Sequence, residues 1–144
     1  MLVRHVMESH PETISPTATV TEAARRMRDR QVGALLVLDG GSMVGLVTDR
    51  DLATRNLAEQ AGPEQPVQDV MTTELICVRP GSPVERAEEL MSEFQVKRLP
   101  VRDEGGLHGV ITQTDIALKC NHEQVGALLE ARVYPSLPPS LGGA

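Results

Sequence analysis

The sequence predicts an α+β fold built from two copies of one β-α-β-β-α unit, and three observations lead to it. First, sliding the chain by 64 residues aligns it with itself without a gap, with 17 identities over the 51 positions from Val3 to Ala53. Chance would give about one identity in fifteen at ordinary residue usage. Second, each copy holds a segment with apolar residues at helical spacing. Third, each copy holds two strand-like runs joined by a glycine-containing turn.

Each element of the repeated unit has its own signal. A short turn, VRHVM or VQDVM, leads to an extended segment that ends at a proline, TISP or CVRP. A helix follows. Thr19 and Glu22 form a capping box before the first helix, and Pro83 occupies the favoured first position of the second. Two strands come next, ALLVLD and MVGLVT in one copy, RLPVRD and LHGVIT in the other. A second helix then begins at Asp51 or Asp115.

The repeat gives the domain boundaries. We expect repeat 1 at residues 1–60, repeat 2 at 61–120, a C-terminal helix at 121–133 and a flexible tail at 134–144. A half of this size buries only about 60% of the surface that its unfolded chain exposes, so it is marginal alone. We therefore expect two small mixed sheets packed face to face about a pseudo-two-fold axis.

The composition excludes several classes of protein. A formal net charge of −6 is unsuited to nucleic acid, which needs a basic face. The longest apolar run, at 34–38, is too short to span a membrane. Two cysteines and no secretory signal fit a reducing cytoplasm. With no Trp, one Phe and one Tyr, a flat base could be held only between aliphatic side chains and backbone.

One pattern, G-x-x-T-x-x-D, follows a strand in both copies, as GLVTDRD at 45–51 and GVITQTD at 109–115. In a structural interpretation, Thr and Asp cap a helix, and Gly lets another backbone approach. In a functional one, the helix N-terminus and the Thr hydroxyl bind a phosphate, the carboxylate accepts from a ribose diol, and Gly leaves room for the nucleotide. The residues alone leave both interpretations open.

Taken in order, four segments resemble a tandem pair of cystathionine-β-synthase (CBS) domains, also called a Bateman module. They are VMESHPETISPTATVTEAARRM, GALLVLDGGSMVGLVTDRDL, VMTTELICVRPGSPVERAEELM and VKRLPVRDEGGLHGVITQTDI, and with their connections they cover roughly residues 3–120. The chain is similar to the stand-alone members of that family. The resemblance implies regulatory binding of an adenosine-containing ligand (AMP, ADP, ATP, S-adenosylmethionine or NAD), no obligatory cofactor, a flat homodimer, and signalling to a separate protein partner.

The resemblance also implies which residues form the two clefts. Those expected at the ribose and phosphate are Asp51, Asp115, Thr48, Thr112 and Thr13, with Cys77 at the position that matches Thr13. Those expected beside the adenine are Ile14, Val78, Leu35 and Leu99. Those expected to add positive charge are Lys97, Arg98 and Arg50, which match Gly33, Ala34 and Thr114 in the other copy. Because the two clefts differ in charge, one of them is expected to dominate.

The histidines show no ligand spacing, and two cysteines far apart predict no metal site. The leading hypothesis is a cytoplasmic binding module that is not an enzyme. The first rival is a structural or interaction protein with vestigial clefts, in which Cys77 and Ala34 mark the decay of the sites. The second is an enzyme that uses a cleft carboxylate. Thermal stability with added nucleotide tests the first rival, and nucleotide turnover tests the second.

Overall fold

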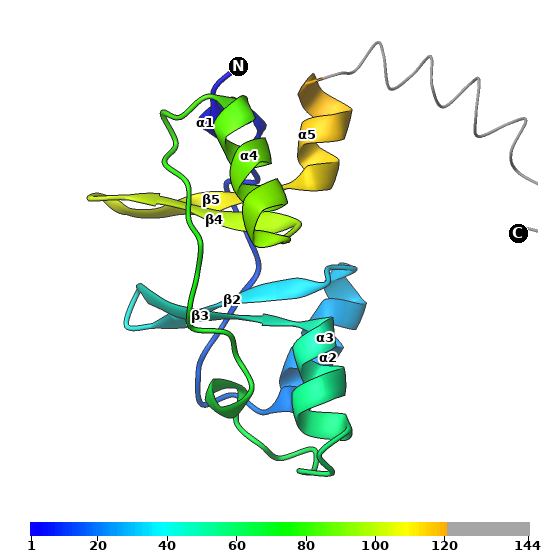
Figure 1. The fold of residues 1–144 in the computed structure, drawn as a ribbon. Helices are drawn as coiled ribbons and strands as arrows, with labels where there is room; N and C mark the ends of the chain where they lie inside the picture. The colour runs from blue at the N-terminus through cyan, green and yellow to red at the C-terminus, as the bar shows by residue number, and fades with distance from the viewer. Residues whose placement is uncertain (121–144) are drawn as a thin grey trace, which may run out of the picture.

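The computed structural model describes residues 1–120, and it shows two repeats whose sheets face each other with the helices outside (Figure 1). The first repeat holds β1 (Thr13–Ile14), α2 (Val20–Arg30), β2 (Ala34–Asp39), β3 (Ser42–Thr48) and α3 (Asp49–Asp51). The second holds α4 (Val84–Phe94), β4 (Arg98–Asp103), β5 (Gly106–Thr112) and α5 (Gln113–Cys120). The predicted α+β architecture is confirmed. The helix predicted at 121–133 and the tail at 134–144 lie outside the described residues.

The two sheets repeat each other in detail. β2 pairs antiparallel with β3, and β4 with β5. Both ladders shift register at equivalent points, between Val37 and Leu38 and between Val101 and Arg102. The parallel pairing of β1 with β2 shrinks in the second repeat to a single bridge between Val78 and Val101. The duplication therefore extends from the strand order to the bulges.

The helices α2 and α4 end alike but begin differently. Thr19 Oγ1 accepts a hydrogen bond from the Glu22 amide at 3.1 Å, so Thr19 is the N-cap, but within residues 1–120 the Glu22 side chain does not return the second bond of the predicted capping box. Pro83 has an extended ψ of 151° and is the N-cap of α4 rather than its first residue, so that helix begins one position later than predicted. Both helices end at a glutamine, Gln31 or Gln95, in the left-handed conformation.

The helices after the two G-x-x-T-x-x-D motifs differ. α3 passes directly into η1 (Leu52–Leu57), a π-helix, which ends with a hydrogen bond from the Ala58 amide to the Ala53 carbonyl at 2.9 Å. α5 is an α-helix throughout its described length. None of the helices within residues 1–120 combines the length and the apolar character needed to cross a membrane.

Each hydrophobic core is completed by a turn from the other copy. α1 (Val3–Val6) opens the first copy, yet Val3 and Val6 are fully buried in the core of the second repeat, around Leu99. η2 (Val67–Asp69) opens the second copy, yet Val67 and Val70 are buried in the core of the first. Figure 1 accordingly shows α1 beside α4, away from α2. Repeats 1–60 and 61–120 thus exchange their first turns.

Candidate ligand-binding site

A cavity of about 710 Å³ lies between the two repeats, where β4 and β5 meet the beginning of the first repeat. We call it the Asp115 cleft. The second repeat contributes Lys97, Arg98, Val110 and residues 112–115. The first copy contributes Glu8, residues 10–12, residues 30–34, Leu36 and Leu46. The cleft therefore joins charged groups and an apolar surface that neither repeat supplies alone.

Asp115 lies in the first turn of α5, and a reciprocal pair of hydrogen bonds holds it. The Thr112 amide donates to Asp115 Oδ2 at 3.2 Å, and the Asp115 amide donates to Thr112 Oγ1 at 3.0 Å. The side chain is partly exposed. Its other oxygen, Oδ1, has no hydrogen-bond partner within residues 1–120. The cap thus orients a carboxylate that can still accept hydrogen bonds from a ligand.

The cleft is lined by both acidic and basic side chains, and only some of them form ion pairs with one another. Arg30 lies with its Nε 3.7 Å from Glu12 Oε1, so these two charges face each other. Lys97 and Arg98 form no ion pair with any residue that the structure describes. Arg98 reaches across to the first repeat, where its Nη2 lies 3.6 Å from the point at which a Cβ on Gly33 would stand, and Asp49 Oδ2 lies 3.2 Å from the same point. Lys97 and Arg98 are therefore the cations available to an anionic ligand.

The corresponding aspartate of the first repeat has a different environment. Asp51 is capped in the same way, with the Thr48 amide 3.0 Å from its Oδ2. It is only 8% exposed, however, and it also contacts the Thr72 hydroxyl and the Arg55 guanidinium. The two motifs are thus alike as helix caps and unlike as sites for a ligand.

The glycines of the two motifs allow chain segments to cross closely. A Cβ on Gly109 would lie 2.2 Å from the Glu8 carbonyl oxygen, and one on Gly45 would lie 2.6 Å from Met71 Sδ. Residues 8 and 72 pair here with Val110 and Leu46. The space beside each glycine is filled by the chain itself, so the structural interpretation of the glycines holds and the room they were expected to leave for a nucleotide is not there.

Comparison with known proteins agrees with this architecture. The family model described as "CBS domain" matches residues 3–57 and again residues 67–121. The chain belongs to the CBS domain family. It is 37% identical over 128 residues to the CBS domain-containing protein YhcV of Bacillus subtilis, covering 88% of this chain and 91% of that one.

Two solved structures of CBS proteins contain adenosine compounds. The CBS domain pair of protein MJ0100, in complex with 5′-methylthioadenosine and S-adenosyl-L-methionine, has a TM-score of 0.76 and 25% identity, covering 85% of this chain and 98% of that chain. CBSX2 in complex with AMP has a TM-score of 0.74 and 26% identity, again covering 85% and 98%.

The structure places four predicted site residues of this CBS pair together in the Asp115 cleft: Lys97, Arg98, Thr112 and Asp115. The four residues expected beside the adenine lie elsewhere: Ile14, Leu35, Val78 and Leu99. All four are at most 5% exposed within the two cores. Successive side chains of a strand point to opposite faces. Leu35 accordingly points into the core, and Leu36 lies at the wall of the cleft, although it is itself only 1% exposed.

The remaining predicted residues do not line this cleft either. Thr13 lies in β1, where its carbonyl accepts from the Arg26 guanidinium. Cys77 Sγ lies 4.0 Å from the Leu75 carbonyl oxygen. Burial raises the pKa of the Cys77 thiol, although the nearby Arg102 acts in the opposite direction. For Cys77 the physical reason is the exchange between copies, because Asp115 shares its cavity with residues 10–12 of the first copy; Thr13 directly follows that segment but lies within the sheet, paired with Leu36.

Arg50, Thr48 and Asp51 form the rest of the predicted set, and Arg50 is exposed on α3. Sequence reasoning missed Glu8, residues 10–12 and 30–32, together with Leu36, Leu46, Val110 and Gln113. No local motif marks them. They become visible only when the strand ends of one repeat are placed opposite the first segment of the other.

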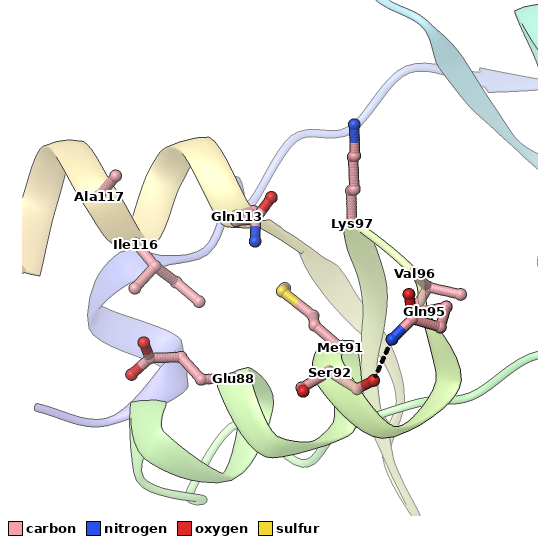
Figure 2. A pocket seen from close by; sticks show the side chains of 9 residues that line it. All are labelled: Glu88, Met91, Ser92, Gln95, Val96, Lys97, Gln113, Ile116 and Ala117. Atoms are coloured by element: carbon pink, nitrogen blue, oxygen red, sulfur yellow. Dashed lines mark hydrogen bonds between the residues drawn. The ribbon is translucent and has the colours of Figure 1, made fainter.

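A separate groove of about 490 Å³ runs between α4 and α5 (Figure 2). Met91 and Ile116 lie within it, with Glu88 at one side. Figure 2 shows Lys97 extending away from these three side chains. Polar side chains make up about half of its lining, and Met91 and Ile116 are themselves buried, so the part of the groove that the structure describes shows no cluster of cations that would suit a phosphate. Within residues 1–120, no three His, Cys, Asp or Glu side chains are grouped so as to hold a metal ion.

Proposed function

We propose that this CBS pair is a regulatory module that binds an adenosine-containing ligand in the Asp115 cleft and passes the signal to a separate protein. The candidates are AMP, ADP, ATP, S-adenosylmethionine and NAD. The observation that carries the proposal is the 710 Å³ cavity, which combines an available carboxylate, two available cations and aliphatic walls. The adenosine compounds in the MJ0100 and CBSX2 structures support it.

Each part of such a ligand has a partner in the cleft. Asp115 Oδ1 would accept from the ribose hydroxyls, and a carboxylate with two lone-pair sites per oxygen suits a diol. Lys97 and Arg98 would bind phosphate, through charge-assisted hydrogen bonds worth about 1.5–3 kcal/mol each. The base would lie against Leu46 and Val110, partly exposed aliphatic side chains of the lining, since no Phe, Tyr or Trp of the described chain lines the cleft.

Thermal unfolding with added ligand tests the proposal. A ligand at 100 times its Kd stabilises the folded state by about 2.7 kcal/mol. For a domain of this size we expect Tm to rise by roughly 5–10 °C with at least one of the five compounds. The Asp115→Ala variant should lose most of this rise. Asp69→Asn, which removes an exposed carboxylate that does not line the cleft, should keep it.

The rival functions predict other outcomes. If no adenosine compound at millimolar concentration shifts the Tm of the wild-type protein, an interaction protein with non-binding clefts is the better account. If bound nucleotide is turned over, and Asp115→Ala abolishes turnover while the protein stays folded, the module is an enzyme.

We also infer that two copies pair through their helical faces. The groove between α4 and α5 has a counterpart of about 580 Å³ between α2 and η1, where Leu57 is 74% exposed, and Leu118 on α5 is 51% exposed. The charges are complementary. α2 carries four arginines against Glu22 and Asp29, whereas α4 carries four glutamates against one arginine. A second copy turned end to end would place the basic helix opposite the acidic one.

The association state and its salt dependence test this pairing. We expect light scattering to find a dimer, and Glu85→Lys with Glu88→Lys to raise its dissociation constant about tenfold or more, since like charges then face each other. Added salt should weaken the wild-type dimer. A monomer at all concentrations would contradict the pairing. A dimer that salt strengthens would contradict the end-to-end arrangement.

A further inference from the structure

The carboxylate of Asp51 is already engaged by the protein itself. The Thr72 hydroxyl lies 3.5 Å from Oδ1 and 3.4 Å from Oδ2, and Arg55 Nε lies 3.7 Å from Oδ1. With the amide of Thr48 on Oδ2 at 3.0 Å, both oxygens have a donor. The Asp51 side chain is accordingly only 11% exposed.

The two groups that contact Asp51 are themselves fixed. Arg55 Nη1 donates to the carbonyls of Val70 and Met71, at 3.3 and 3.2 Å. The amide of Thr72 donates to the Leu46 carbonyl at 2.8 Å, and the Leu46 amide returns a bond to the Thr72 carbonyl at 3.0 Å. The hydroxyl and the guanidinium are therefore held beside the carboxylate by backbone from both copies. Asp51, Thr72 and Arg55 together are called the Asp51 lock below.

The second repeat lacks such a lock because two residues differ. Glu8 takes the place of Thr72 in the matching ladder, with bonds of 2.8 and 3.0 Å to Val110. A carboxylate has no proton to donate to Asp115, and Glu8 Oε1 instead accepts from the His10 amide at 2.9 Å. Lys119 takes the place of Arg55. Its Nζ donates to the Val6 carbonyl at 3.0 Å and is not within ion-pair distance of Asp115.

We propose that the chain binds one nucleotide, in the Asp115 cleft, and that the Asp51 lock fills the other ribose position from within. The part of this inference that concerns the ligand rests on the proposed function, whereas the part that concerns the Asp51 lock does not. With the Thr72 hydroxyl at 3.4–3.5 Å and the Arg55 guanidinium at 3.7 Å, a diol would have to displace both groups to reach the Asp51 carboxylate. Asp51 therefore ties η1 to the chain that joins the two repeats, whereas Asp115 is left to the ligand.

Calorimetric titration with AMP tests the stoichiometry. The wild-type protein should bind one AMP per chain. Asp51→Asn should keep that stoichiometry with a Kd within about threefold, and the matched Asp115→Asn should weaken binding at least tenfold, since it removes the charged acceptor. Two AMP molecules per wild-type chain, or loss of a binding event in Asp51→Asn, would overturn the proposal.

Unfolding without ligand tests the lock independently. Both asparagine variants alter the same cap, so the difference between them reports Thr72 and Arg55. We expect Asp51→Asn to lower Tm by about 5 °C more than Asp115→Asn does. In a protein that already carries Thr72→Val and Arg55→Gln, adding Asp51→Asn should lower Tm much less than it does in the wild-type protein. Equal losses in the two asparagine variants would refute the lock. A failure of every adenosine compound to bind the wild-type protein would refute the proposed function, and the lock would still be decided by these Tm values.

Discussion

Removal of residues 1–7 should destabilise the second repeat, although these residues open the first copy of the sequence. Val3 and Val6 are both 0% exposed in that core, and burying a valine contributes about 1.5–3 kcal/mol, or about 3–6 kcal/mol for the pair. The deletion also removes the bond from the Val3 amide to the Ser82 carbonyl at 2.8 Å. Since the stability of a domain is about 5–15 kcal/mol, urea denaturation should show a large loss.

Hydrogen exchange in two matched variants locates the effect. Val6→Ala should speed amide exchange at Ile111 in β5 more than at Val47 in β3, and Val70→Ala should do the reverse. The two substitutions are the same change at equivalent positions of the repeat. The exchange of turns between copies would be contradicted if Val6→Ala loosened β3 first.

Gly109→Ala should be the most damaging single-methyl addition at the two repeated motifs. The new Cβ would lie 2.2 Å from the Glu8 carbonyl oxygen and 3.1 Å from its carbon. This backbone cannot move away easily, because it exchanges two hydrogen bonds with Val110. Overpacking of this kind costs about 3 kcal/mol or more, which Tm and urea midpoints would measure.

Gly45→Ala is the matched control. Its Cβ would meet Met71 Sδ at 2.6 Å and Cγ at 2.9 Å, both on a flexible side chain, with the Thr72 carbonyl oxygen at 3.1 Å. Methionine can change rotamer, so we expect a loss of about 1 kcal/mol. Equal losses of stability in Gly109→Ala and Gly45→Ala would contradict this prediction. They would show that it does not matter whether the new Cβ meets backbone or a flexible side chain.

The order of elements could be predicted because the duplication repeats the local signals. Thr19 caps α2 as its spacing with Glu22 indicated. The turn at Gly40 and Gly41 closes a hairpin because both glycines adopt positive φ, which a two-residue hairpin of this kind needs. Such features depend on residues close together in the chain, so sequence reasoning reaches them.

Two features of the site depend on packing and could not be predicted in the same way. Residues 34–38 are apolar at every position, so alternation does not tell which leucine faces the core, and packing assigns Leu35 to it. The valines of the two opening turns are identical in the two copies. The sequence therefore does not tell which hydrophobic core each opening turn joins. Thr72 follows one of these turns, so its contact with Asp51 could not be predicted either.

The crossing of the chain at its beginning has a mechanical consequence. Residues 8–12 run from Val6, embedded in one half of the molecule, to Ile14, embedded in the other, and most of this short strap forms a wall of the Asp115 cleft. A ligand in the Asp115 cleft would contact this strap, whose two ends are anchored in different hydrophobic cores. We therefore expect a ligand bound in the Asp115 cleft to stabilise both repeats together.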